Sequence, residues 1–440
     1  MTGEDFLLKI IAILLSLMLL SQSLFFKKIT KNFFHPAALF PLIWFLYTFL
    51  PLILLFTIPI NPIGMVYILI FSLAFSSTAL FFDWSKLKNK HPQKGNSYFI
   101  KLLIYCFSIL SCVFTILHLR IQGIDVNFDI TSTLQSAGQY ALLSGQARII
   151  GNIYFTLSLI FAYSSSALGG YIYRANTGSF KKSLLVFLSF APAVLIVILM
   201  SGKLILFYSL TLFVAARLLV KIHKGEKFLT SRLNIKKSFV LLFLLIFVIL
   251  FSINSRTYQA GGTGSILQNA DYVFNTFINY TMAQIYAFSD FLSVYLEIKD
   301  GNVYDEDFVS NGHYTFNGIL SQFGYGQEMP IGLYQESYNY NNRLSTNIFT
   351  GFRGIIVDFG MIIGVIIMSF FGLISNINHY FLLKNSAPYI SSAVYCIIVA
   401  YIFSFYLVSF FVARWSFAVL IILFIVFFID QYKFKWKNHK

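Results

Sequence analysis

Long apolar segments, separated by short polar connections, extend along the chain from residue 6 to residue 430. A helix needs about 20 apolar residues to cross the hydrocarbon core of a membrane. This length predicts about eleven membrane helices, at residues 6–26, 37–57, 63–82, 99–119, 149–173, 183–200, 201–220, 237–254, 354–378, 388–411 and 413–430. We therefore expect an all-α polytopic membrane protein whose residues 1–440 form a single membrane-embedded domain.

Lysine-rich connections alternate with lysine-poor ones along this series of helices. The lysine-rich group comprises residues 27–31, 86–94, 174–182, 217–237, Lys384 and 433–440. Because lysine and arginine are retained on the cytoplasmic side of membranes, we predict that all of these connections are cytoplasmic. An odd number of helices then places the N-terminus outside and the C-terminus inside. The first apolar segment lacks a basic flank and an A-x-A cleavage site, so we interpret it as a retained helix.

The same alternation places two polar segments outside, at residues 121–148 and 255–353. In a Gram-negative bacterium this side of the cytoplasmic (inner) membrane is the periplasm. The second segment is the one large external loop of the chain. Within it, residues 265–298 have the pattern of an amphipathic helix that could lie along the membrane interface. Residues 300–345 are rich in Gly, Asn, Tyr and acidic side chains, and we expect irregular structure there.

Composition agrees with a membrane protein, since 58% of residues are hydrophobic and 11% are charged, against about 25% charged in soluble domains. The net charge of +15 is explained by cytoplasmic lysines, so we expect no nucleic-acid partner. Cys106, Cys112 and Cys396 lie in apolar segments, which predicts neither a disulfide nor a metal role. The sequence contains no P-loop and no G-x-G-x-x-G, and we expect no cofactor.

Cationic side chains on the predicted outer side are few, and most are arginines near helix ends. They are Lys9, Arg120, Arg148, Lys203, Arg256, Lys299, Arg343, Arg353 and Arg414. A guanidinium can donate to two phosphate oxygens and stays charged when partly buried, so this set favours a site for an anion near the membrane. The alternative for each residue alone is a side chain that reaches toward the interface or pairs with a loop carboxylate.

Asp358 is predicted near the start of a membrane helix, five residues after Arg353. It could orient an arginine, act as a general base for a sugar hydroxyl, or be an acidic residue near the start of its own helix that the helix dipole favours. His313 is the only histidine in the large loop and is a second candidate base. Asp290, Glu328 and Glu336 are further candidates for this role.

Two other features of the large loop suggest binding. Tyr334, Tyr338 and Tyr340 lie close together and could stack on sugar rings, although tyrosines are also common at membrane interfaces. The acidic run at 305–307 could hold a hard cation, but such runs are usually solvated turns, so we predict no metal.

Several short motifs resemble those of O-antigen polymerases (Wzy-type), which are oligosaccharide repeat-unit polymerases. Ser201-Gly202-Lys203 is similar to the family's Ser-Gly-Ser-Arg-Gly stretch, and Ser255-Arg256 opens the major loop as in the family. The segment from Ser345 through Asn347 to Asp358-Phe359-Gly360 and Gly364 resembles the family's Asn-x-x-Thr…Asp-Phe-Gly-x-x-Gly pattern. Arg343 with Gly354, and Arg353 with Gly364, fit an Arg-x10-Gly spacing.

The resemblance implies a GT-C-like helical fold and inverting transfer between oligosaccharides linked to undecaprenyl pyrophosphate. It assigns pyrophosphate binding to Lys203, Arg256, Arg343 and Arg353, with Arg148 and Arg414 as further candidates. Catalysis would involve Asp358, Arg353 or His313, and sugar binding would involve Asn347, Tyr334, Tyr338 and Tyr340. The implied partners are membrane lipid, the lipid-linked oligosaccharide and a chain-length-determining co-polymerase.

Two other functions remain open at this point. An O-antigen ligase would use the same lipid-linked donor with lipid A-core as acceptor, and His313 would fit its functional histidine. A flippase or transporter would be expected to show an internal repeat and charges within several helices. The sequence shows no convincing repeat, and its charges lie mostly at helix ends.

Overall fold

The computed structural model describes residues 2–85, 87, 97–124, 126, 136–140, 143, 151–174, 179–226, 270–298, 304, 311–327, 334, 336–341 and 343–437. The chain divides into two compact units. Unit 1 comprises Met1–Lys90 and Phe277–Ser416, and unit 2 comprises His91–Thr276 and Phe417–Lys440.

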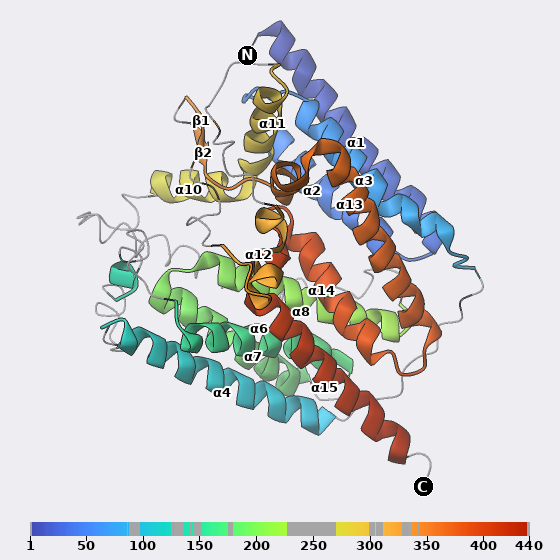
Figure 1. The fold of residues 1–440 in the computed structure, drawn as a ribbon, viewed down its shortest axis with the longest axis vertical. Helices are drawn as coiled ribbons and strands as arrows, with labels where there is room; N and C mark the ends of the chain where they lie inside the picture. The colour runs from blue at the N-terminus through green and yellow to red at the C-terminus, as the bar shows by residue number, and fades with distance from the viewer. Residues whose placement is uncertain are drawn as a thin grey trace. The chain divides into compact units, whose positions relative to one another are not determined.

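Unit 1 is built around five apolar helices. They are α1 (Gly3–Thr30), α2 (Pro36–Leu54), α3 (Ile63–Ser77, extended by the 3-10 helix η1, Thr78–Phe81), α13 (Gly351–Lys384) and α14 (Tyr389–Ser404). Helix α1 packs against α2 and α3, while α13 packs against α3 and α14 (Figure 1). Aromatic rings fill the core, where Phe352 lies 4.6 Å from Trp44 and 4.8 Å from Phe405 between ring centroids.

Local capping explains where two of these helices begin. Thr2 and Asp5 form a reciprocal capping box at the start of α1, with hydrogen bonds of 3.1 and 2.9 Å. At α2, the His35 side chain accepts a hydrogen bond from the Ala37 N–H, and Pro36 supplies a pre-set φ angle at the first helical position.

Unit 2 contains α4 (Ser97–Ile121), α6 (Ile153–Tyr171, followed by the 3-10 helix η2, Ile172–Arg174), α7 (Ser179–Met200) and α8 (Lys203–His223). These four helices pack side by side (Figure 1). Helix α15 (Trp415–Lys437) belongs mainly to this unit, and its Asp430 accepts a hydrogen bond of 3.1 Å from Tyr171. Hydroxyl groups join α4 to α6, because Thr115 and Ser158 lie 2.6 Å apart and Ser108 and Ser165 lie 2.9 Å apart.

The large polar segment contributes three described helices and a hairpin. These are α10 (Ala270–Met282), α11 (Gln284–Tyr295), α12 (His313–Gln322), and strands β1 (Tyr338–Tyr340) and β2 (Leu344–Thr346), which pair antiparallel. Helix α11 is largely buried and packs against α3, and the interfacial position of this stretch stays a prediction. The expectation of irregular structure is wrong at α12 and at the hairpin, whose turn Asn341 adopts a positive φ of 47°.

Eight described helices are long and apolar enough to cross a membrane: α1, α2, α3 with η1, α4, α6, α7, α8 and α13. Helix α14 and the apolar part of α15 (Trp415–Gln431) are shorter. The predicted span at 237–254 lies outside the described residues. An all-α polytopic membrane architecture is therefore confirmed, while the count of eleven and the GT-C-like fold stay predictions.

Helix α13 is broken near its beginning. Gly360 has φ 73° and ψ 174°, which is not helical, so a short first segment at 351–359 is followed by a long second one. A residue with a side chain would be strained at this φ, and glycine is the residue that adopts it freely. The break separates the start of α13, which carries Arg353 and Asp358, from the apolar remainder of the helix.

Candidate functional site

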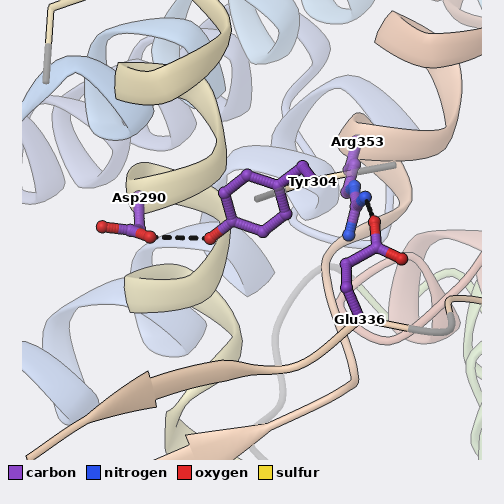
Figure 2. A network of polar contacts seen from close by, with 4 residues as sticks. All are labelled: Asp290, Tyr304, Glu336 and Arg353. Carbon is purple, nitrogen blue, oxygen red and sulfur yellow. Dashed lines mark hydrogen bonds and ion pairs between the residues drawn. The ribbon is translucent and has the colours of Figure 1, made fainter. Parts of the chain in front are cut away.

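Arg353 lies in the first turn of α13 and is almost fully buried, with 1% of its surface exposed. A charge in such a place needs partners, because transfer from water is costly. Its Nη2 atom forms an ion pair with Oε1 of Glu336, which precedes strand β1 (Figure 2). Among the described residues, Nε and Nη1 of Arg353 have no hydrogen-bond acceptor.

Four aromatic rings surround this guanidinium, and we call them the Arg353 cage. The Cζ atom of Arg353 lies close to the centres of all four rings, at 4.0 Å for Tyr334, 4.1 Å for Phe349, 4.6 Å for Phe291 and 5.1 Å for Tyr304. The negative π faces of aromatic rings attract a cation, and a guanidinium stacks on them more readily than an ammonium group. The cage therefore holds a buried positive charge in place while leaving nitrogen donors unused.

A second carboxylate reaches the cage through Tyr304. The Tyr304 hydroxyl donates a 2.7 Å hydrogen bond to Oδ2 of Asp290, which is half-buried on α11. Figure 2 shows the Tyr304 ring between Asp290 and Arg353. The site thus combines one guanidinium with Glu336, which it contacts directly, and with Asp290, which it reaches through a tyrosine.

Asp358 connects the start of α13 to α12. Its Oδ1 atom accepts a 3.2 Å hydrogen bond from the backbone N–H of Tyr314, the second residue of α12. Gly312 precedes that helix and has no side chain to cap it, so Asp358 supplies the acceptor from another element. This contact with the N-terminus of α12 is none of the three interpretations of Asp358 given above, which stay predictions.

The rings of Tyr314 and Tyr334 link α12 to the Arg353 cage. They are stacked, with centroids 5.0 Å apart. Burial raises the pKa of Tyr334 above its ordinary value, an effect that the nearby Arg353 charge opposes. The Tyr334 hydroxyl has no hydrogen-bond partner among the described residues. This tyrosine therefore contributes its neutral ring to the cage.

His313, the first residue of α12, is buried. Its Nδ1 atom lies 3.1 Å from Oδ1 of Asn317. Asn317 in turn makes two hydrogen bonds with the main chain of Gln327, at 2.9 and 3.0 Å. His313 is therefore part of a network that fixes α12 and the turn after it.

Two other predicted cationic residues of unit 1 lie at exposed positions. Arg343 is exposed in the hairpin turn, and Arg414 is exposed just before α15. Lys203 is the first residue of α8 and belongs to unit 2. Arg148 and Arg256 lie outside the described residues.

The predicted sugar-binding residues occupy different surroundings. Tyr334 belongs to the Arg353 cage, while Tyr338 is buried in β1 and burial together with the nearby Asp290 charge raises its pKa. Tyr340 is half-buried at the end of β1, and Asn347 is half-buried after β2. In the part of the chain that the structure describes, no three His, Cys, Asp or Glu side chains gather in a possible metal site.

The structure adds Phe291, Tyr304 and Phe349 to the candidate site. The sequence offered no signal for them beyond the aromatic richness of the loop, because the cage combines rings from α11, from the segment after it and from the approach to α13. The glycines of the Arg-x10-Gly spacing have a packing role: a Cβ atom on Gly354 would lie 3.2 Å from Tyr314, and one on Gly364 would lie 3.0 Å from Phe71.

Comparisons with known proteins gave no family for this chain: no family model, no curated protein and no solved structure matches it. The resemblance to O-antigen polymerases therefore stays a prediction that rests on the motifs of the sequence.

Proposed function

We propose that the protein is a membrane glycosyltransferase that polymerises oligosaccharide repeat units carried on undecaprenyl pyrophosphate, at the outer face of the cytoplasmic membrane. The observation that carries this proposal is the buried Arg353 guanidinium, held by four rings, with Nε and Nη1 lacking acceptors among the described residues. Such a group suits phosphate oxygens near lipid, because it stays charged and donates in a fixed geometry.

Glu336 occupies Nη2 of Arg353 in the structure, and we infer that it stands where a substrate anion would bind. The donor pyrophosphate would displace this carboxylate and accept hydrogen bonds from the guanidinium. The cage would remain in contact with the guanidinium throughout, so little rearrangement of the cation would be needed. Preorganised positive charge of this kind lowers the barrier where negative charge develops in the transition state.

In the proposed reaction, a hydroxyl oxygen of the acceptor sugar attacks C1 of the donor sugar. The bond between C1 and the pyrophosphate oxygen breaks, and the electron pair leaves with the pyrophosphate, whose charge Arg353 stabilises. The hydroxyl proton passes to Asp290, which Tyr304 orients beside the cage. Asp358 acts as a positioning residue, because its bond to Tyr314 connects α12 and the Tyr334 ring to α13.

Two residues support a polymerase over the alternatives of a ligase and a flippase or transporter. His313, which would suit a ligase, is buried and hydrogen-bonded to Asn317. The charge at Arg353 lies in the first turn of its helix, whereas a carrier would be expected to place charges deep within several helices.

The test is a gel of surface polysaccharide from a strain in which the gene is deleted and then complemented. We expect deletion to reduce a long ladder to core plus one repeat unit, and wild-type protein to restore the ladder. Arg353→Ala should fail to restore it, and Arg353→Lys should restore it poorly because an ammonium cannot replace the stacked, forked guanidinium. Lys384→Ala, at the exposed far end of the same helix, is the matched control.

Other gel patterns would overturn the proposal. Loss of every repeat, with long lipid-linked polymer accumulating, would identify a ligase. Lipid-linked single units retained on the cytoplasmic side would identify a flippase. A full ladder from the variant carrying both Arg353→Ala and Arg343→Ala would show that polymerisation does not require these arginines.

A further inference from the structure

The last part of one predicted span is not a continuous α-helix. The apolar segment 388–411 forms helix α14 only as far as Ser404, and residues 405–414 are irregular apart from the 3-10 helix η3 (Phe410–Val412). This stretch is nonetheless apolar, and Phe405 and Phe410 are fully buried. Lipid offers no hydrogen bonds, so irregular backbone at membrane depth occurs only where protein covers it or where it lines an aqueous cavity.

Two neighbouring elements cover this unwound stretch. The backbone N–H of Gly351, at the start of α13, donates a 2.8 Å hydrogen bond to the carbonyl oxygen of Phe405. The Ser409 hydroxyl donates a 2.8 Å bond to the carbonyl of Thr315 in α12. A Cβ atom on Gly318 would clash with the carbonyl oxygen of Ala413, so α12 approaches the stretch backbone to backbone.

The depth of α12 follows from the rings that it contacts. Phe316 of α12 lies 5.7 Å from Phe371 of α13, which lies 5.1 Å from Tyr401 of α14. At about 1.5 Å of rise per residue, Phe371 is about 20 Å along α13 from Lys384, and Tyr401 is about 18 Å along α14 from Tyr389. If the exposed Lys384 marks the inner edge of a hydrocarbon core about 30 Å thick, these rings lie about 10 Å inside its outer edge.

From this geometry we propose that α12 is a re-entrant helix: it enters the outer leaflet from the polar loop, covers the unwound end of α14, and presents its C-terminal turn to membrane lipid. This inference is independent of the proposed function, because it rests on contacts of α12 with α13 and η3. The C-terminal turn of α12 belongs to the large polar loop, and its proposed partner is phospholipid.

The turn at the end of α12 has the properties of a lipid contact. Phe323 and Tyr325 are 72% and 73% exposed. The turn is nevertheless fixed, because the Tyr325 N–H bonds to the Leu320 carbonyl at 3.0 Å and Asn317 holds Gln327 through two hydrogen bonds. Two large rings held outward by a fixed backbone lose little conformational freedom when they enter an apolar phase.

A charge beside this turn fits the same partner. The Gln322 side chain donates a 3.4 Å hydrogen bond to the carbonyl oxygen of Arg414, whose own side chain is exposed. An arginine at this depth can extend to the phosphate layer while its aliphatic part stays among lipid chains. The surface thus combines two rings suited to the acyl region with one cation suited to phosphate.

The test places tryptophan at the turn in full-length protein reconstituted into phospholipid nanodiscs. Phe323→Trp and Tyr325→Trp are made separately, and the fluorescence of the native tryptophans is subtracted with wild-type protein. Quenching is measured with lipids that carry a spin label on the headgroup or at a shallow acyl position, and with aqueous iodide. Ile366→Trp on the exposed face of α13 is the lipid reference, and Asn339→Trp on the exposed side of β1 is the water reference.

We expect both turn variants to resemble Ile366→Trp, with at least twofold stronger quenching by the shallow lipid label than in Asn339→Trp and with weak quenching by iodide. Strong iodide quenching without lipid quenching would overturn the proposal and assign the turn to an aqueous surface. Quenching by neither reagent would overturn it as well, since the turn would then be covered by protein. Unchanged unfolding midpoints in detergent confirm that each variant is folded, and agreement between the two positions guards against a local effect of either substitution.

Discussion

The coupling between Arg353 and Glu336 can be predicted from their burial. Only 2% of the Arg353 side chain and 16% of the Glu336 side chain are exposed. Removing one partner of a buried ion pair costs about 3–5 kcal/mol, because the other charge is left without compensation. Among the described residues, the guanidinium in Glu336→Ala keeps its four rings but no ion-pair partner, so we expect a loss of about 3 kcal/mol in the free energy of unfolding.

Replacing Arg353, the other partner of the pair, should lower the free energy of unfolding by less. In Arg353→Met a flexible apolar side chain replaces the cation among aromatic rings, which suits its thioether, and Glu336 can turn toward water. We expect a loss of about 1.5 kcal/mol for this variant, and a similar loss for the double variant, because neither contains a buried unpaired cation. The coupling energy of the double-mutant cycle is then about 3 kcal/mol.

Reversible unfolding by dodecyl sulfate in mixed micelles, followed by intrinsic fluorescence, measures these free energies. Hydrogen exchange at residues 336–346 reports whether the β1–β2 hairpin loosens with Glu336→Ala. Additive single effects, within about 0.5 kcal/mol, would refute the reasoning, because two residues in direct contact within a buried ion pair should show a coupling energy. Glu336 contacts the first turn of α13, whereas Lys384 is the last residue of that helix, so Glu336→Ala and Lys384→Ala should be additive and serve as the control pair.

Three further predictions concern residues around the same site. Gly360→Ala should destabilise the protein by about 1 kcal/mol, because alanine is strained at the positive φ of this position. A clash would not contribute, since nothing lies within 4 Å of a Cβ atom there. An unchanged unfolding midpoint would contradict the break in α13. Asp358→Ala should cost about 1 kcal/mol by uncapping α12, whereas Asp358→Asn keeps an acceptor and should cost less, a difference that hydrogen exchange at Tyr314 would detect. Burial raises the pKa of Tyr334, so the folded state binds this proton more tightly and stability is lost as pH rises above about 10. Tyr334→Phe should therefore have the wild-type free energy of unfolding at pH 7. Above about pH 10, its free energy of unfolding should fall by up to about 1.4 kcal/mol per pH unit less than that of the wild type, and identical pH dependences of the two proteins would disprove this account.

The apolar pattern was sufficient to predict most membrane helices, because each one spans about 20 apolar residues in sequence and hydrogen-bonds its own backbone. The limits of that reasoning appear at 388–411. The composition of this segment is apolar throughout, but its last part is unwound because α12 and α13 satisfy its backbone groups. Periodicity cannot reveal such a partner, which is contributed by a distant part of the chain.

The candidate site shows the same division. The sequence by itself singled out Arg353, Asp358 and Tyr334, because a few charged and aromatic residues stand out against an apolar background. Only the tertiary structure decided that Arg353 pairs with Glu336 and lies among four rings, and that Asp358 caps α12. Helix identity is local, since it depends on side chains within a few turns, whereas the burial and pairing of a charge depend on which distant segments fold against it.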